Sequence, residues 1–402
     1  MPGRLTGASL PFAVGPLTTA VARPPLAVAL LPLAVALAGW LSACDAPQFP
    51  RDLATLQDST ATVDILESSA MCSDCITVDR VVALGDTAGP GYINWSIYVA
   101  VDDAGNYWVG QQQEGVIKVW DAEGRFLRQV GRRGDGPMEF HRPAPVRTDG
   151  EGRVHIVDLD IGRETIVNAD FSYHSDRLLD PGGSHLAVPL GDDGRYLLNR
   201  ARMTTQRVAM PLHIVNGPNV LHSFGRMAGL DAPGNAHRVL AVDRQPRIYS
   251  TRAGDYLIQV WSESGRRILG LRGPRLNEKE ARPERWSPDN PPRSEIYAMQ
   301  VDSEQRLWVI GLALRDDWQD HMELRRMPNG QIAYGPTDGD IRTIFQGRID
   351  VIDLTRGSFI ATRRHDALLE AFVGDGLAIE NTETETGYPQ MVVWRLGFDA
   401  AG

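Results

Sequence analysis

The segment VDDAGNYWV, residues 101–109, recurs as VDSEQRLWV at residues 301–309. Each copy starts with Val-Asp, passes through a polar turn and ends in a strand-like run that contains tryptophan. Related starts are TDGEGRVHI (148–156), LGDDGRYLL (190–198), VDRQPRIYS (242–250) and the shorter FVGDGLAIE (372–380). These starts indicate one strand–turn–strand unit that occurs six times.

A second element repeats in phase with the first. IKVWDAEGRFLRQVG begins at Ile117 and IQVWSESGRRILGLRG begins at Ile258, 141 positions later, the same offset that separates Asp102 from Asp243. Two other starts lie between these copies, so the unit is about 47 residues long. Four short strands in such a unit, with Gly and Asp at the turns, are typical of a β-propeller blade. We therefore predict an all-β, six-bladed β-propeller over residues 61–402; a solenoid or a pair of β-sandwiches is the alternative.

The two ends of the repeat region predict how the ring closes. The segment DRVVALG, ending at Gly85, resembles the outer strand of a blade but has no strands of its own before it. MVVWRL, residues 391–396, resembles the third strand of a blade, and no fourth strand follows. We expect residues 76–85 to pair with residues 391–396, because this N-terminal strand would close the ring and remove two exposed sheet edges.

The beginning of the chain has the features of a secretion signal. Arg4 and Arg23 precede an apolar run, residues 26–40, which Pro32 interrupts and which is shorter than the ~20 residues of a membrane-spanning helix. The sequence Leu-Ser-Ala-Cys at residues 41–44 then resembles the bacterial lipobox. That resemblance implies a lipoprotein signal peptide (1–43), lipidation of Cys44, a linker (44–60) and membrane attachment through the lipid in the bacterial cell envelope, facing the periplasm or the exterior. A permanent transmembrane helix is the alternative.

Charge and cysteine content narrow the possible partners. The net charge of −10 disfavours nucleic acid, because an acidic chain gains nothing from phosphate counterion release. After lipidation of Cys44, Cys72 and Cys75 remain as a pair, and outside the cytoplasm we expect them to form a small disulfide. A zinc site would need further ligands that no nearby spacing supplies. We expect a monomer.

The stretch GRRGDGPMEFHRPAP, residues 131–145, lies between two predicted blades. It contains an Arg-Gly-Asp tripeptide and several glycines, but no helix follows to make it a phosphate-binding loop. We interpret it as the crossing from the outer strand of one blade to the inner strand of the next.

This crossing resembles that of the bacterial six-bladed β-propeller lipoproteins, which are related to the NHL-repeat propellers. The residues that carry the resemblance are Gly131, Arg132, Gly134, Gly136, Pro137, Glu139 and Phe140. It implies that Phe140 fills the space between two blades and that the glycines permit the crossing. Its members share a fold rather than a known reaction.

Candidate ligand-binding residues follow from the same crossing and its copies. They are Arg132, Arg133, Asp135, His141, Arg142 and Arg226, with Arg147, Arg282 and Arg285 on the same face. Arginine presents forked donors that fit carboxylate and phosphate, so we predict binding of a small anionic ligand, such as a sugar acid or a peptide carboxylate, or of a protein partner at the channel face. A solvated rim of Arg–Glu pairs is the simpler alternative.

The sequence assigns no catalytic residue and no metal ligand. Asp102, Asp149, Asp243 and Asp302 recur at one turn position, which indicates turn chemistry rather than catalysis. The alternative function is an extracytoplasmic, metal-dependent hydrolase or lyase of the lactonase type, with calcium or zinc as cofactor in the channel. An insertion at residues 311–347 interrupts the repeat, and its segment DDWQDHMELRR is expected to form a short helix over the channel.

Overall fold

The structure is a computed structural model that describes residues 62–72, 74–180, 183–203, 209–225, 236–274, 286–287, 290–326 and 332–399. All the described residues belong to one compact unit. The predicted signal peptide, Cys44 and the linker lie outside the described residues. No helix within the described ranges is long and apolar enough to cross a membrane.

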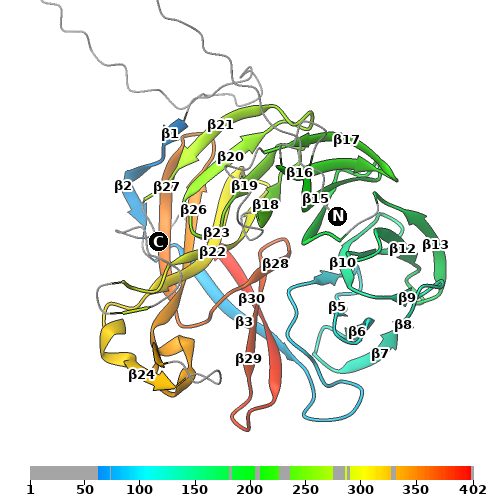
Figure 1. The fold of residues 1–402 in the computed structure, drawn as a ribbon, viewed down its shortest axis with the longest axis horizontal. Helices are drawn as coiled ribbons and strands as arrows, with labels where there is room; N and C mark the ends of the chain where they lie inside the picture. Colours follow the sequence, from blue (N-terminus) through cyan, green and yellow to red (C-terminus); the bar gives the residue numbers. More distant parts are fainter. Residues whose placement is uncertain are drawn as a thin grey trace, which may run out of the picture. The chain divides into compact units, whose positions relative to one another are not determined.

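Six sheets of four or five strands, here called blades 1 to 6, form the body of this unit (Figure 1). Blade 1 comprises β4 (Val99–Val101), β5 (Tyr107–Gln111), β6 (Val116–Trp120) and β7 (Phe126–Val130). Blade 2 comprises β10 (Pro143–Thr148), β11 (Val154–Asp158), β12 (Arg163–Val167) and β13 (Tyr173–Leu178). Blade 3 comprises β14 (Leu186–Leu190), β15 (Arg195–Met203), β16 (Ala209–Asn216) and β17 (Asn219–Phe224). Blade 4 contains β18 (Val239–Val242), β19 (Ile248–Thr251), β20 (Leu257–Trp261) and β21 (Arg267–Arg272). Blade 5 contains β22 (Glu295–Val301), β23 (Arg306–Leu314), β26 (Phe345–Asp353) and β27 (Ser358–His365). Blade 6 contains β28 (Ala371–Gly374), β29 (Leu377–Glu383) and β30 (Pro389–Phe398).

An apolar cluster fills each boundary between neighbouring blades. Each cluster contains residues from both blades, for example Trp108 and Ile156, Val157 and Leu198, Leu197 and Ile248, Ile258 and Met299, Trp308 and Ala378, and Ile379 and Tyr107. The last pair joins blade 6 to blade 1, so the six blades form a ring. The chain is therefore a six-bladed β-propeller, and the six predicted starts all fall at the first hairpin of a blade.

The fourth strand of blade 6 comes from the beginning of the described chain. β3 (Ile76–Leu84) pairs antiparallel with β30, from Ile76 opposite Phe398 to Leu84 opposite Met391. Figure 1 shows β3 (blue) beside β30 (red). This is the pairing expected between residues 76–85 and 391–396.

Two further strands before β3 were not expected. β1 (Thr62–Asp64) pairs parallel with β21 at the outer edge of blade 4, and β2 (Leu66–Cys72) pairs parallel with β27 at the outer edge of blade 5. Residues 62–84 therefore run along the outer edges of three successive blades, and each pairing covers backbone groups that an open sheet edge would expose.

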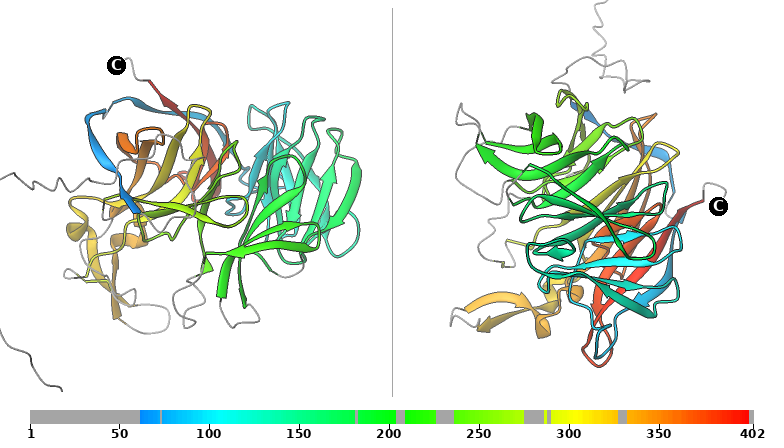
Figure 2. Two further views of the ribbon diagram at one scale, coloured as in Figure 1. Left: turned by 90° about the horizontal axis from the view of Figure 1, so that it is seen from above. Right: turned by 90° about the vertical axis from the view of Figure 1, so that its right-hand side faces the viewer.

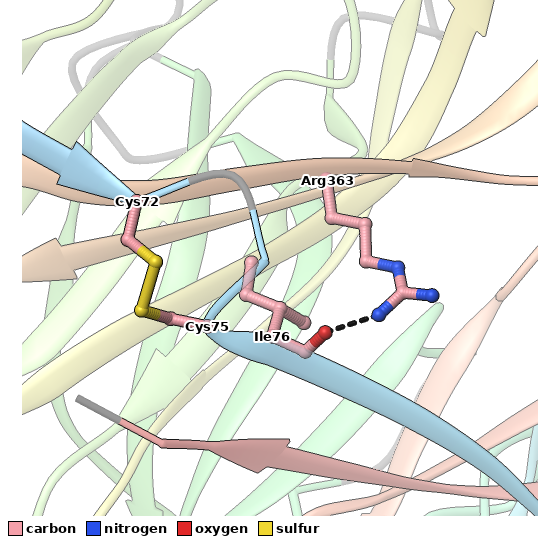
Figure 3. The surroundings of a disulfide bond; sticks show 4 residues. All are labelled: Cys72, Cys75, Ile76 and Arg363. Atoms are coloured by element: carbon pink, nitrogen blue, oxygen red, sulfur yellow. Dashed lines mark hydrogen bonds between the residues drawn. A yellow bond between two sulfur atoms is a disulfide. The ribbon is translucent and has the colours of Figure 1, made fainter. Parts of the chain in front are cut away.

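The disulfide between Cys72 and Cys75 lies where this segment passes from blade 5 to blade 6 (Figure 3). Next to it, the guanidinium of Arg363 on β27 donates a hydrogen bond to the carbonyl of Ile76 on β3. The disulfide and this bond together fix the start of β3 against blade 5.

The recurring aspartates are turn residues, as the sequence indicated. Oδ1 of Asp302 accepts the backbone N–H groups of Glu304 and Arg306, both at 2.9 Å. The corresponding carboxylates of Asp102, Asp149 and Asp243 accept the same two amides in their own turns. These bonds satisfy the N–H groups of the turn that no strand can pair.

Phe140 fills the boundary between blades 1 and 2. Its side chain is fully buried in the cluster that contains Trp108 and Ile156. Gly131 has a φ of 76°, and a side chain there would collide with the Phe140 ring. The glycine is therefore required both for the backbone turn and for the burial of Phe140.

The insertion in blade 5 differs from the prediction in its extent and its structure. β23 and β26 pair as far as Leu314 and Phe345, so the insertion spans residues 315–344 rather than 311–347. The segment expected to be a helix forms only a 3-10 turn, η3 (Trp318–His321), and the strand β24 (Met322–Arg326), which pairs with β25 (Ile332–Pro336). Figure 2 shows this hairpin projecting from the blades.

Candidate functional site

The crossing at residues 131–142 is held by ion pairs and hydrogen bonds. Arg132, whose side chain is 79% exposed, pairs with Glu139, and Arg133 donates to the carbonyl of Gln113 at 3.2 Å. Asp135 lies 2.9 Å from Nε2 of His141. Three further predicted residues, Arg226, Arg282 and Arg285, lie outside the described residues.

Two buried residues of blade 2 fix the backbone of this crossing. Asp158 accepts the N–H of His141 at 2.6 Å, and Arg163 donates to the carbonyls of Asp135 and Glu139. Arg142 pairs with Asp160 at 2.9 Å. The predicted residues are thus near one another along the loop. None of those that the structure describes lines the cavity between blades 5, 6 and 1.

The cavity lies on the same face, the crossing face, where loops lead from the outer strand of one blade to the inner strand of the next. It has a volume of about 360 Å³ and lies where blades 5, 6 and 1 meet. Its lining residues are Trp95, Ile97, Tyr297, Ile341, Arg342, Leu368, Glu370 and Asn381. They come from the 92–98 segment, β22, η5 (Ile341–Thr343), the loop before β28, and β29.

Asn381 is the residue that organises the cavity. Its Oδ1 accepts the N–H of Ser96 at 3.3 Å and its Nδ2 donates to the carbonyl of Ser96 at 2.9 Å. The hydroxyl of Ser96 donates to the carbonyl of Gly110 at 2.7 Å. A side chain of blade 6 and a strand of blade 1 thereby hold the loop that carries Trp95 and Ile97.

Glu370 orients the exposed tryptophan. Its Oε2 accepts the indole N–H of Trp95 and Nδ2 of Asn381, both at 3.0 Å. Burial raises the pKa of Glu370 above its ordinary value, although these two hydrogen bonds act in the opposite direction. Trp95 is 61% exposed and its polar edge is already bonded, so it offers the face of its ring to a ligand.

Arg342 is brought to the cavity by the end of the insertion. Oδ1 of Asp340 accepts the N–H of Arg342 at 2.9 Å and caps the short turn η5. The Arg342 side chain donates to the carbonyl of Asn381 at 3.2 Å and lies 3.5 Å from Oε1 of Glu380. It remains 34% exposed, so the guanidinium is positioned and still accessible.

The rim of the cavity is apolar. Ile97 is 42% exposed and Ile341 is 41% exposed, and with Trp95 they are three of the large hydrophobic residues that the described chain leaves open to solvent. Leu368 and Tyr297 form the wall beneath them. An exposed apolar rim around a few polar groups is typical of a ligand site.

A pair of histidines lies elsewhere on the crossing face. The rings of His185 and His237, which precede the inner strands of blades 3 and 4, have centroids 3.7 Å apart and planes tilted by 32°. Burial, together with the charges of His237 and Arg142, lowers the pKa of His185. The hydroxyl of Tyr98 donates to the carbonyl of His185 at 2.8 Å, and Tyr98 follows Ile97 directly. Tyr98 therefore connects the histidine pair to the 92–98 segment that lines the cavity.

No group of three or more His, Cys, Asp or Glu side chains in the described ranges could hold a metal ion. The sequence signal that could have found the cavity is Trp95, an aromatic residue in a crossing, in the stretch GYINWSIYVA at 91–100. Neither Arg342 nor Asn381 belongs to the repeat pattern on which the sequence prediction depended.

Comparisons with known proteins yield the fold. No protein-family model matches the sequence, and no curated protein matches it significantly. A "putative exported protein" of Bacteroides fragilis is 11% identical, with 84% of this chain and 99% of that chain covered and a TM-score of 0.50. A member of the DUF4221 family from Bacteroides vulgatus is 9% identical over 82% of this chain and 98% of its own, with a TM-score of 0.47. Virginiamycin B lyase from Staphylococcus aureus is 11% identical over 81% of this chain and 100% of its own, with a TM-score of 0.38. The similarity to the Bacteroides fragilis protein supports the six-bladed β-propeller fold.

Proposed function

We propose that this chain is a binding protein of the bacterial cell envelope that takes a small ligand with an anionic group into the cavity between blades 5, 6 and 1. The observation that carries the proposal is the cavity itself, with Arg342 accessible beside the exposed ring of Trp95. The apolar part of the ligand would contact Trp95, Ile97 and Ile341. Its anionic group would pair with the Arg342 guanidinium.

The position of Arg342 supports an anion as partner. The guanidinium is held by a carbonyl and by a carboxylate at 3.5 Å, which is long for a charge-assisted hydrogen bond. A ligand carboxylate can therefore engage its remaining donors without breaking a short ion pair. The hydrogen bond from the Arg342 side chain to the carbonyl of Asn381 orders the guanidinium in advance and so reduces the entropy that it loses on binding.

Titration calorimetry of the purified chain with apolar carboxylates, such as isovalerate and N-acetyl-leucine, tests this function. We expect binding to the unaltered chain and a loss of at least tenfold in affinity in Arg342→Gln and in Trp95→Ala. Arg132→Gln is the matched control, because Arg132 belongs to the crossing that the sequence predicted as the site. If Arg132→Gln loses binding while Arg342→Gln retains it, the ligand binds at the 131–142 crossing instead.

We also propose that Cys44 carries the lipid and that the chain is related to the NHL-repeat-like propeller lipoproteins. The lipobox-like sequence supports the first, and the 131–140 motif with buried Phe140 supports the second. The Bacteroides fragilis protein of the same fold, itself described as exported, agrees with an extracytoplasmic address. In cells fed a labelled fatty acid, the chain should become labelled and Cys44→Ser should not; an unlabelled chain would contradict the anchor.

In this proposal, the ring is closed by β3, a strand that follows the predicted anchor and linker in the sequence and pairs with β30. The binding function is preferred to a metal-dependent hydrolase or lyase because the described residues supply a preformed pocket with an accessible cation. Stoichiometric zinc or calcium in the purified chain, lost on substitution of a histidine or aspartate of the crossing face, would favour the enzyme.

A further inference from the structure

We propose that the ligand of this cavity is a small zwitterion of the α-amino acid class with an apolar side chain, whose carboxylate is bound by Arg342 and whose ammonium is bound by Glu370. This inference rests on the proposed function and names its ligand class. It follows from three properties of the cavity: its apolar wall, its two opposite charges and its size.

The wall fits an apolar side chain. Five of the eight lining residues are Trp95, Ile97, Tyr297, Ile341 and Leu368. A sugar ring carries hydroxyls around most of its perimeter and would leave several of them against these apolar groups without partners. A branched aliphatic or aromatic side chain instead gains about 25 cal/mol for each Å² of apolar surface that it buries there.

The two charged groups are held at a fixed spacing by one residue. The side chain of Asn381 donates to Oε2 of Glu370 at 3.0 Å, while its carbonyl accepts from Arg342 at 3.2 Å. Glu370 and Arg342 therefore lie on two sides of Asn381 and line the same cavity. An α-amino acid presents its ammonium and carboxylate on one carbon, and we expect it to contact both groups at once.

Within the described ranges, no cationic side chain pairs with Glu370. It accepts hydrogen bonds from Trp95 and Asn381, which are neutral, whereas Glu380 is held by Arg342 at 3.5 Å. A carboxylate in an apolar cavity is unfavourable until a cation joins it. An anion without an ammonium would add a second negative charge beside Glu370, but a zwitterion supplies the missing cation.

The size of the cavity agrees with a single amino acid. Its volume of about 360 Å³ lies at the lower end of the range of about 300–1,000 Å³ that small-molecule sites occupy. The exposed rim at Trp95 leaves room for an extension beyond the carboxylate or the ammonium. The terminal residue of a short peptide therefore belongs to the same ligand class.

Titration calorimetry of the purified full chain with five probes tests the inference. The probes are L-leucine, N-acetyl-L-leucine, L-leucinamide, isovalerate and glucuronate. We expect L-leucine to bind most tightly, with acetylation of the ammonium and amidation of the carboxylate each weakening binding at least tenfold. Glucuronate, a sugar acid without an apolar side chain, should bind at least tenfold more weakly than leucine.

Variants assign the two charges. Glu370→Gln keeps an oxygen acceptor for Trp95 and Asn381. It should weaken the binding of leucine at least tenfold and leave the affinity for N-acetyl-leucine unchanged or higher. Arg342→Gln should weaken both. Thermal unfolding of each variant, with a midpoint close to that of the unaltered chain, shows that the loss is not one of folding.

The outcomes separate this inference from the proposed function. Equal or tighter binding of N-acetyl-leucine, isovalerate or glucuronate than of leucine would overturn the zwitterion and leave an anion-binding cavity. Binding of leucinamide as tight as that of leucine would overturn the role of the anionic group and with it the proposed function. Absence of binding by all five probes at millimolar concentration would overturn both.

Discussion

The side-chain amide of Asn381 pairs with both backbone polar groups of Ser96, a residue 285 positions earlier in the chain. The pairing imitates one rung of a β-ladder, made by a side chain instead of a strand. It connects blade 6 to the loop that enters blade 1, and the same amide holds Glu370. A structural connection and the arrangement of the cavity therefore depend on one residue.

Asn381→Ala should both destabilise the protein and impair the cavity. It leaves the N–H and carbonyl of Ser96 without partners, which we expect to cost about 2–3 kcal/mol in the free energy of unfolding. The loop that carries Trp95 is released, so affinity for an apolar carboxylate should fall at least tenfold. Urea unfolding and titration calorimetry measure the two effects.

Asn199→Ala is the matched control, because Asn199 makes the same kind of connection in blade 3. Its Oδ1 accepts the N–H of Arg238 at 2.9 Å and its Nδ2 donates to the carbonyl of Ala236 at 2.7 Å. This variant should lose similar stability and keep its affinity. A comparable loss of affinity in both variants would show that the cavity responds to general loosening of the ring.

Glu370 makes the stability of the protein depend on pH. Burial raises its pKa above the ordinary 4.5, with Glu380 adding to the effect and the bonds from Asn381 and Trp95 opposing it. Between the ordinary and the raised value the folded protein binds more protons than the unfolded chain, so the free energy of unfolding falls as the pH rises. The groups that surround Glu370 are Trp95 of the 92–98 segment, Tyr297 of β22, Arg342 of η5, and Glu380 and Asn381 of β29.

The Glu370→Gln variant cannot titrate, so its stability relative to the unaltered chain should increase between pH 4 and pH 7 and then remain constant. Urea unfolding at a series of pH values checks this. Glu123→Gln, at a 68% exposed position, is the control and should show a constant difference. A constant difference for Glu370→Gln as well would contradict the burial of the Glu370 charge.

Asp302 shows the opposite pH dependence. Burial opposes its ionisation, but hydrogen bonds from Trp308 and Arg306 outweigh burial and lower the pKa of Asp302 below its ordinary 3.8. Its stabilising contribution is complete above the ordinary value and is lost as the pH falls through the lowered one. At pH 7, Asp302→Ala should cost about 1–3 kcal/mol, because it unpairs two turn amides.

That cost should shrink when unfolding is measured at pH 2 instead of pH 7. Glu304→Ala in the same turn, at a 68% exposed position, should change stability by less than about 0.5 kcal/mol at either pH. An undiminished effect of Asp302→Ala at pH 2 would mean that the neutral carboxyl supports the turn equally well.

The fold was predictable because its determinants recur. Each blade repeats the turn of its first hairpin, and in four blades an aspartate accepts the same two backbone amides. The number of such turns in the sequence therefore gives the number of blades. β3 was predictable because the sequence has an outer strand without a blade before the first repeat and lacks an outer strand in the last repeat. β1 and β2 were not, since short parallel strands added to an edge pair through the backbone and need no particular side chains.

The cavity was not predictable because its residues occur once. Trp95, Arg342 and Asn381 come from a crossing, an insertion and a second strand, and only the closed ring brings them together. The sequence instead indicated the arginines of one crossing. In the structure Arg132 and Arg142 have carboxylate partners within their own surroundings, Glu139 and Asp160.

The strands β1, β2 and β3 supply the outer edges of blades 4, 5 and 6. The side chains of Ile76 and Leu84 are fully buried, and Leu84 packs in the cluster between blades 6 and 1. Leu84→Ala should therefore cost about 2–5 kcal/mol. The loop between Cys72 and Cys75 is short, so replacing both cysteines by serine should cost only about 2 kcal/mol or less.

Removal of β1 and β2, in a chain that starts at residue 74 and carries Cys75→Ser, should lower the unfolding midpoint and leave one cooperative transition, because each blade keeps four strands. Removal of β3 as well would expose the edge of β30 and open the boundary with blade 1. That shorter chain should aggregate or unfold in more than one step. If it instead unfolds like the chain that starts at residue 74, β30 does not need its partner and the ring does not depend on the pairing of its two ends.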